Sequence, residues 1–353
     1  MRFRPIVTTF TALALTMAGV QPAAAQEPST LDVRARSIES RPWIKLAGTA
    51  AQLNDRAGSL RLASYALVSD AGQKLEGYLR EGDRFVKTPY REALVAPGGR
   101  WVAGVPGYEL WEAKKKIDLI DRRTRRKYTI SLPAPVTSPE WSSDGRTLLL
   151  TAYQEHRDES LTIIGFITLS VADRVPRLVK AGPRHTVADW SIGREYRFFF
   201  AGRPDRVLAR HNDADDGSSK SRLAVYDLSG RRLRYYTGAG SPDEWSAAQV
   251  FSPSGRLFGT VVRDDDSTRA EIRIVSASTG KVLRRIRGKD IRGFAGWYGD
   301  RHIIVKRERG RSQLFQRVDL SGRADLDLIE EKLIFNGAEY DPHLERVNFV
   351  RPN

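Results

Sequence analysis

The stretch SSDGRTLLLT, residues 142–151, joins a short polar turn to an apolar strand. The same pattern returns as APGGRWVAGV at 96–105, SIGREYRFFF at 191–200, SPSGRLFGTVV at 252–262, YGDRHIIVK at 298–306 and HLERVNFV at 343–350. Counted from the basic residue of each turn, the intervals are 46, 48, 62, 45 and 45 residues. A strand-based repeat of about 40–50 residues is typical of a β-propeller blade. The sequence therefore predicts an all-β propeller.

A second polar turn accompanies each repeat. These turns are SDAGQK at 69–74, DRRTRRK at 121–127, SVADRV at 170–175, DLSGRR at 227–232, SASTGKV at 276–282 and DLSGRA at 319–324. Around the turn at 227–232 apolar and polar residues alternate, with Leu223 and Val225 before it and Leu233 and Tyr235 after it. Period-two alternation about a Gly-containing turn indicates a β-hairpin. Each repeat then supplies two hairpins, which together make a four-stranded blade.

The order of the hairpins predicts how the ring closes. The chain begins with a second hairpin at 62–79 and ends with a first hairpin at 338–350. We expect these half-blades to pair into one blade shared by the two ends, which removes an exposed sheet edge. The count is then six blades, and seven only if residues 32–54 form strands of their own. We interpret residues 26–60 as a lead-in that packs Trp43 and Ile44 on a propeller spanning 61–353.

The 62-residue interval predicts an insertion. We place it mostly at 202–220, in a polar stretch rich in Asp, Gly and Ser that is typical of a surface loop.

The N-terminal 25 residues have the layout of a secretory signal peptide. Arg2 and Arg4 precede an apolar stretch at 6–20, and three alanines at 23–25 offer a cleavage site before Gln26. The alternative is an uncleaved membrane anchor, for which the apolar run is short of the roughly 20 residues that span a bilayer. We therefore expect a protein secreted to the cell envelope or beyond, with no transmembrane segment after cleavage.

Composition narrows the chemistry. The chain has no cysteine, which excludes disulfides, thiolate metal sites and cysteine nucleophiles. Its formal net charge is +15, which favours anionic partners such as wall polymers, acidic glycans or lipid surfaces. Secretion argues against nucleic acid as a partner, and we expect a monomer that binds a protein or an anionic polymer.

The turn-and-strand units resemble those of a known group of proteins. PEWSSDGRTLLLTA at 139–152 and VFSPSGRLFGTVV at 250–262 are similar to the repeat unit of TolB-like and WD40-like (PD40-type) propellers, and YDLSGR and VSASTGK are similar to its second turn. The resemblance covers residues 62–352 and implies a fold more than a function. The chain departs from WD40 proteins in lacking the Trp-Asp dipeptide, and from TolB in lacking room for a helical N-terminal domain.

Catalytic signatures are weak. No G-x-S-x-G nucleophile elbow occurs, and the five histidines form no local zinc motif. Two acidic clusters offer the hard oxygen ligands that Ca²⁺ prefers; they are Asp213, Asp215, Asp216 and Asp264, Asp265, Asp266. The first cluster fails the EF-hand template at two ligand positions, and the competing interpretations are a solvated loop and ordinary turn chemistry.

The densest basic run lies on a second-hairpin turn and consists of Arg122, Arg123, Arg125, Arg126 and Lys127. Such a cluster binds phosphates or sulfates through charge-assisted hydrogen bonds, or is simply a solvated hairpin tip. Tryptophans recur at equivalent places, which we interpret as packing between blades rather than as a sugar-binding mouth; they are Trp141, Trp190, Trp245 and Trp297.

Two functions remain. The first is a secreted, non-enzymatic binding or scaffold module without a cofactor, which the missing catalytic constellation favours. The second is a Ca²⁺-assisted, lactonase-like hydrolase in the central channel. For the second, acidic residues near the starts of the inner strands would be the ligands; they are Glu92, Glu140, Asp189, Glu244 and Glu339.

Overall fold

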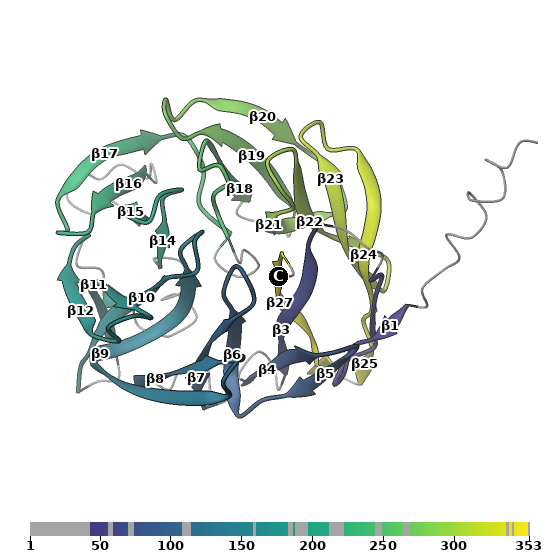
Figure 1. Ribbon diagram of the computed structural model, residues 1–353. Coiled ribbons are helices and arrows are strands. Elements are labelled where there is room, and N and C mark those ends of the chain that lie inside the picture. The colour runs from purple at the N-terminus through teal and green to yellow at the C-terminus, as the bar shows by residue number, and fades with distance from the viewer. Residues whose placement is uncertain are drawn as a thin grey trace, which may run out of the picture. The chain divides into compact units, whose positions relative to one another are not determined.

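The computed structural model describes residues 43–55, 59–69, 74–107, 114–157, 160–182, 186–187, 197–211, 222–243, 249–263, 269–336, 339–340 and 342–351. They belong to one compact unit, residues 41–353. Strands and turns account for its regular structure, and no helix occurs among the described residues. The sheets stand around a central axis (Figure 1), which confirms the all-β propeller. The predicted signal peptide, residues 1–25, lies outside the described part.

The two ends of the chain share one sheet, as predicted. Its order is β27 (His343–Val350), β3 (Arg61–Ser69), β4 (Lys74–Glu81) and β5 (Arg84–Lys87), with β27 antiparallel to β3. The predicted division into two strands from each end was wrong, because the C-terminal end supplies one strand and the N-terminal end three. HLERVNFV is the first strand of this sheet, near the centre in Figure 1, and not the second strand of a hairpin. β25 (Phe335–Asn336) and β26 (Glu339–Tyr340) pair separately.

The largest sheet has eight strands. It runs β12 (Pro176–Lys180), β11 (Leu161–Ser170), β10 (Thr147–Glu155), β9 (Arg126–Trp141), β8 (Lys114–Asp121), β7 (Trp101–Pro106) and β6 (Tyr90–Val95), with β13 (Thr186–Val187) on β11. The long strand β9 joins two groups of strands, because its first part pairs with β8 and its last part with β10.

Two further sheets follow along the chain. One is β14 (Phe198–Phe200), β15 (Arg206–His211), β16 (Arg222–Asp227) and β17 (Arg232–Thr237). The other is β18 (Leu257–Arg263), β19 (Ala270–Ser276) and β20 (Val282–Ile286), with Phe251 bridged to Phe258 on its inner side.

The repeat at 191–200 was assigned to the wrong strand. The FFF run was expected to follow a turn, but it forms the first strand, β14, and the turn comes after it, where the Ala201 N–H donates to the Arg206 carbonyl at 2.9 Å. The three phenylalanines are all buried. A run of three phenylalanines has no alternation of apolar and polar residues. It therefore fits the first or the second strand of a sheet equally well, and the sequence pattern could not decide between them. The turn at 201–206 lies inside the stretch 202–220 that was expected to be the insertion, so the residues that lengthen this repeat lie both before and after the turn. Residues 212–220 of that stretch lie outside the described residues.

The lead-in forms strands but no separate sheet. β1 (Ile44–Lys45) and β2 (Ala51–Leu53) make a hairpin that pairs with β24 (Ala324–Lys332). β23 (Ser312–Asp319), β22 (His302–Arg309) and β21 (Ile291–Trp297) complete this sheet. Ile44 packs against the core as expected, whereas Trp43 is 41% exposed, so the prediction that it packs on the propeller was wrong.

Two tryptophans join backbone segments that lie side by side on the inside of the propeller. The Trp141 indole donates to the Leu94 carbonyl and the Trp297 indole to the Val250 carbonyl, each at 2.8 Å. Both rings are buried at the end of an inner strand. The predicted packing role is confirmed for these two, while Trp190 and Trp245 lie outside the described residues.

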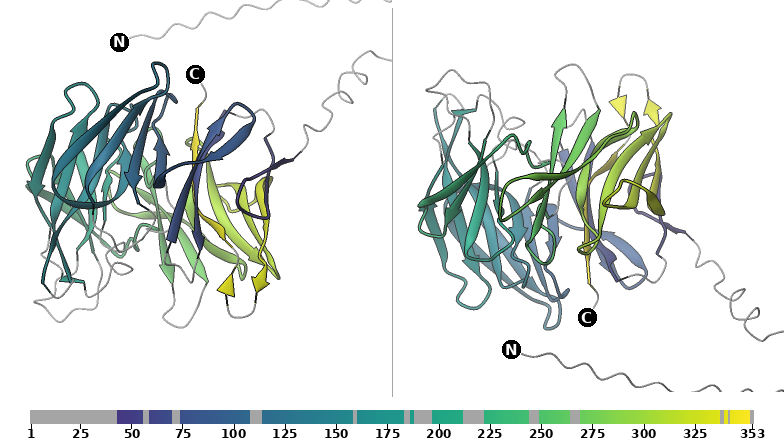
Figure 2. Two further views of the ribbon diagram at one scale, coloured as in Figure 1. Left: turned by 90° about the horizontal axis from the view of Figure 1, so that it is seen from below. Right: turned by 90° about the horizontal axis from the view of Figure 1, so that it is seen from above.

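The strands run between two faces of the propeller (Figure 2). Because neighbouring strands are antiparallel, the turn after a first strand and the turn after a third strand lie at the same face. Backbone bonds join them: the Arg122 N–H donates to the Arg100 carbonyl and the Ala277 N–H to the Arg256 carbonyl, both at 2.9 Å. We call this the short-turn face.

Candidate functional site

The short-turn face is hollowed beside the inner strands. A cavity of about 500 Å³ lies between turns that come from distant parts of the sequence. Its lining consists of Leu60, Pro97, Gly98, Ser143, Asp144, Gln249, Pro253, Trp297, Phe349, Val350 and Arg351. We refer to it as the turn hollow.

Close packing of the turns shapes this hollow. A Cβ on Gly145 would lie 2.5 Å from the Pro97 carbonyl oxygen, and the residue has φ = +67°, so both space and backbone demand glycine. The Ser142 hydroxyl donates to the Asp144 carboxylate at 2.6 Å and accepts from the Thr147 N–H at 3.0 Å. These bonds explain the polar residues of the repeat and hold Asp144 in the wall.

The lining suits a polypeptide segment. Leu60, Trp297 and Phe349 give apolar surface, and Phe349 packs edge-on against the Tyr298 ring at 6.4 Å. Asp144 and Arg351 are both exposed and add one charge of each sign. A mostly apolar wall with a few polar groups is the usual makeup of a binding site. The hollow was not predicted from the sequence, because its walls are ordinary turn residues from separate repeats.

The predicted basic cluster lies on the same face, at the turn between β8 and β9. Arg122, Arg123, Arg125, Arg126 and Lys127 are all exposed. Arg122 has a structural part, since its guanidinium donates to the Gly99 carbonyl at 3.2 Å and to the Arg80 carbonyl at 2.8 Å.

Its neighbours are partly neutralised. Lys127 lies 3.6 Å from Asp118, and Asp121 is bound by Arg100 at 2.8 Å. Hydrogen bonds from Arg100 hold the pKa of Asp121 at about 2. Arg123, Arg125 and Arg126 have no carboxylate partner among the described residues, so the tip adjoining the turn hollow keeps a net positive charge.

The acidic residues near the inner strands have structural partners. Glu140 accepts the Phe200 N–H at 3.2 Å, Asp243 accepts the Phe294 N–H at 2.9 Å, and Glu331 accepts the Leu344 N–H at 3.0 Å. Each carboxylate therefore binds the backbone of the next sheet around the propeller. Such bonds satisfy buried N–H groups that no strand partner reaches.

Two of the predicted acidic ligands are in the described inner strands. Glu92 is buried and accepts from Arg346 at 2.6 Å, a pair that links β6 to β27. Glu140 is buried near Arg197 and Arg346; burial raises its pKa to about 8, although both guanidinium charges act in the opposite direction. These groups are engaged in joining strands across the axis.

The other predicted ligands cannot be placed. Asp189, Glu244, Asp213, Asp215, Asp216, Asp264, Asp265 and Asp266 lie outside the described residues, and so does the side chain of Glu339. Within the described ranges, no group of three His, Asp or Glu side chains is arranged to hold a metal ion.

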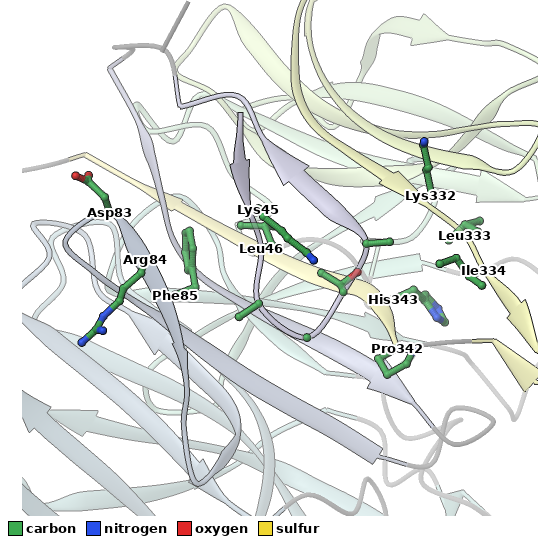
Figure 3. Close-up of a pocket in the computed structure, with 14 residues that line it drawn as sticks. Lys45, Leu46, Asp83, Arg84, Phe85, Lys332, Leu333, Ile334, Pro342 and His343 are labelled. Atoms are coloured by element: carbon green, nitrogen blue, oxygen red, sulfur yellow. The ribbon is translucent and has the colours of Figure 1, made fainter. Parts of the chain in front are cut away.

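A second cavity, of about 620 Å³, lies where the lead-in hairpin meets the shared sheet. Leu46, Phe85 and Ile334 give it apolar walls, the Lys45 side chain extends between its two ends, and Lys332 lies at one end (Figure 3). Asp83 and Arg84 lie at one end and Lys332 to Ile334 at the other. We refer to it as the seam cleft.

The arrangement of the sheets defines a β-propeller, and comparison with solved structures agrees with this fold. No protein-family model matches the sequence, and no curated protein matches it. Among solved structures, TolB from Acinetobacter baumannii is similar at 15% identity, covering 83% of this chain and 68% of TolB, with a TM-score of 0.50.

Other similar structures belong to peptidases. The β-propeller domain of the Trilobed protease from Pyrococcus furiosus is 14% identical over 78% of this chain and 84% of its own, with a TM-score of 0.46. The acylaminoacyl peptidase of Pyrococcus horikoshii is 12% identical over 79% and 45%, with a TM-score of 0.48. At such identities the likeness to TolB confirms the resemblance at the level of fold alone.

Among the described residues there is no helix with the length and hydropathy to cross a membrane.

Proposed function

We propose that the protein is a secreted, non-enzymatic β-propeller that binds a partner through its short-turn face. The observation that carries this proposal is the turn hollow, a concave and largely apolar site assembled from several repeats. The basic tip at 121–127 adjoins it through the bond from Arg122 to Gly99. An acidic protein segment or an anionic envelope polymer would complement both features.

The architecture we propose for this module is a six-bladed ring. The eight-stranded sheet is counted as two blades divided at β9, and the other four sheets around the axis as one blade each. We propose export through the predicted signal peptide, residues 1–25, and a monomeric module. Rigid blades presenting exposed turns suit a binding role.

The proposed calcium-dependent alternative receives less support. Glu92, Glu140, Asp243 and Glu331 already bond to arginines or to backbone N–H groups. A metal would have to displace these contacts and leave buried donors unpaired, which is costly. Melting temperatures in EDTA and in Ca²⁺ test this alternative through the two aspartate clusters, since a bound ion stabilises the folded state.

Site-specific photo-crosslinking tests the binding proposal. A benzoylphenylalanine placed at exposed Ser143, in the wall of the hollow, is expected to capture an envelope component in the producing cell. The same group at Arg177, exposed on β12, is the matched control. Phe349→Ala or Arg351→Glu should reduce capture from Ser143 severalfold, because each changes the hollow lining. Equal capture from both positions, or capture indifferent to both substitutions, would contradict the proposal.

Neutralising the basic tip separates the two kinds of partner. If a polymer is bound, changing Arg123, Arg125 and Arg126 to Gln should weaken binding to a sulfated or phosphorylated polymer strongly, and salt should do the same. If an acidic protein segment is bound, the hollow substitutions should dominate and the tip should mainly slow association.

A further inference from the structure

The outer edges of two neighbouring sheets carry an exposed combination of leucines and cations. Leu228, Leu233 and Leu283 are 37%, 37% and 46% exposed, and large apolar side chains with that exposure are few among the described residues. Beside them lie Arg232, Lys281 and Arg284, which are exposed and have no ion pair within the part of the chain that the structure describes. We call these six residues the rim patch. Arg232 and Leu233 lie on β17 and Leu283 and Arg284 on β20, the outer strands of their sheets (Figure 1), and Leu228 and Lys281 lie in the turns that lead into these strands.

A β-bulge at the same place in both sheets exposes the leucines. In one sheet Val225 pairs with Arg234 and Tyr226 with Arg232, so Leu233 is left over. In the next, Ile274 pairs with Arg284 and Val275 with Val282, so Leu283 is left over. A bulge leaves the extra residue unpaired and turns the strand. The bulge interrupts the alternation of Leu233 and Tyr235 that indicated this hairpin.

The two edges form one continuous surface. Arg234 of β17 donates to the Ala277 carbonyl at 2.7 Å and to the Ser278 carbonyl at 3.0 Å, in the turn that leads to β20. The segment 276–289 has five basic side chains and no acidic one. Glu271 pairs with Arg285 and Arg287 of this segment and with Arg273. Among the described residues, Lys281, Arg284 and Lys289 of the segment have no ion pair, so its outer surface stays cationic.

The rim patch is poorly suited to receive a protein strand. The bulges twist both edges, and cationic side chains on an edge discourage strand addition. The Arg284 guanidinium even donates to the Leu283 carbonyl at 2.9 Å. Edge protection explains the cations, but exposed leucines work against it, because apolar edge residues promote aggregation. A partner that accepts both kinds of side chain explains the whole set.

We propose that the rim patch docks the protein edge-on to an anionic lipid surface. The cations lie against the headgroups, and the leucines enter the boundary with the acyl chains, as in interfacial binding generally. Charge complementarity carries the choice of occupant. Edge-on docking leaves the turn hollow on the short-turn face accessible, so this proposal is independent of the proposed function.

Vesicle co-sedimentation tests the proposal on the exported chain, with its N-terminus verified by mass spectrometry. Vesicles of equal parts phosphatidylglycerol and phosphatidylcholine should bind the protein, and pure phosphatidylcholine should not. High salt should weaken binding, because it screens the cations. Leu233→Ser with Leu283→Ser should reduce vesicle partitioning about tenfold, since two apolar anchors are lost. The exposed Ile334 of the seam cleft, changed to Ser, is the matched control and should bind as wild type.

The outcomes are distinguishable. Unchanged vesicle binding by the double leucine variant would overturn the proposal and assign the cations to a soluble polyanion, which binding of dextran sulfate without leucine dependence would show. Thermal melts confirm that both variants are folded. Phe349→Ala in the turn hollow should leave vesicle binding intact, and the leucine variant should leave crosslinking from Ser143 intact, so failure of either proposal leaves the other standing.

Discussion

The outer strands β20 and β24 occupy the same position in two neighbouring sheets and have opposite character. The turn and strand around β20, residues 276–289, contain five basic side chains, whereas 319–332 around β24 contain five acidic and two basic ones. Both carry the same bulge, filled by exposed Leu283 in one and by Asp325 in the other. The same local geometry therefore supports two surfaces.

The difference follows from what covers each edge. β24 pairs with β2 of the lead-in hairpin over Ile329 to Glu331, so this part of its edge is covered by the chain itself. β20 ends its sheet among the described residues, and cations occupy that edge. An uncovered edge needs charge or a bulge to avoid pairing with another chain, and a covered edge does not.

The largest expected effect comes from the covering hairpin. Leu53→Ala removes a side chain that is 1% exposed and packed in the core beside β24, and should lower the free energy of unfolding by about 2–5 kcal/mol. Leu283→Ala, the same change on the open edge, should stay within about 0.5 kcal/mol of wild type. Urea unfolding measures both, and equal losses would show that β24 gains nothing from being covered.

Two glutamates should give these edges opposite responses to pH. Glu331 is buried on β24, and burial raises its pKa, although bonds from Thr49 and from the Leu344 N–H oppose this. For Glu271, behind β20, burial alone would also raise the pKa, but hydrogen bonds from Arg273, Arg287 and Arg285 outweigh it and lower the pKa to about 2.

The signs follow from which state holds the proton. Folded Glu331 keeps its proton above the ordinary pKa of 4.5, so its contribution to stability declines as pH rises past that value. Folded Glu271 stays charged below 4.5, so its contribution of about 1–2 kcal/mol is present above that pH and is lost as pH falls toward 2. Glu331→Gln should flatten the first decline and Glu271→Gln the second, as unfolding at a series of pH values will show. Exposed Glu330→Gln is the control and should change neither.

Repeats and composition predicted the propeller fold correctly, but they did not predict which strand of a sheet two of the repeat segments form. The turn residues repeat because they make the same hydrogen bond in different repeats. The Ser142 hydroxyl, which also donates to Asp144, accepts the Thr147 N–H, and the Ser252 hydroxyl accepts the Leu257 N–H at 3.3 Å in the same way. Buried inner strands carry apolar residues on both sides, so FFF at 198–200 and HLERVNFV at 343–350 read equally well as first or second strands. A turn with glycine at positive φ, such as Gly202 after FFF, was the signal that would have corrected the first.

The candidate sites divide in the same way. The exposed tip at 121–127 could be predicted, because a run of like charges favours a solvated turn. The turn hollow could not, since Pro97, Ser143 and Pro253 are ordinary turn residues until closure of the ring brings them together. Glu140 was predicted as a ligand from its place near an inner strand, and the place is right, but its side chain instead accepts a hydrogen bond from the Phe200 N–H of the next sheet.

The smallest effect is expected from a test of whether a leucine on the bulge is enough for vesicle binding, or whether the cations around it are needed as well. Asp325→Leu gives β24 the residue found on β20 and removes its pair with Arg317 at 2.8 Å. Stability should fall by less than about 1 kcal/mol, because the pair is partly exposed. Vesicle partitioning, measured as above, should rise less than about twofold, since the acidic side chains of β24 still repel anionic headgroups. A rise as large as the loss in the double leucine variant would mean that a leucine on a bulge suffices and that the cations of β17 and β20 only guard their edges.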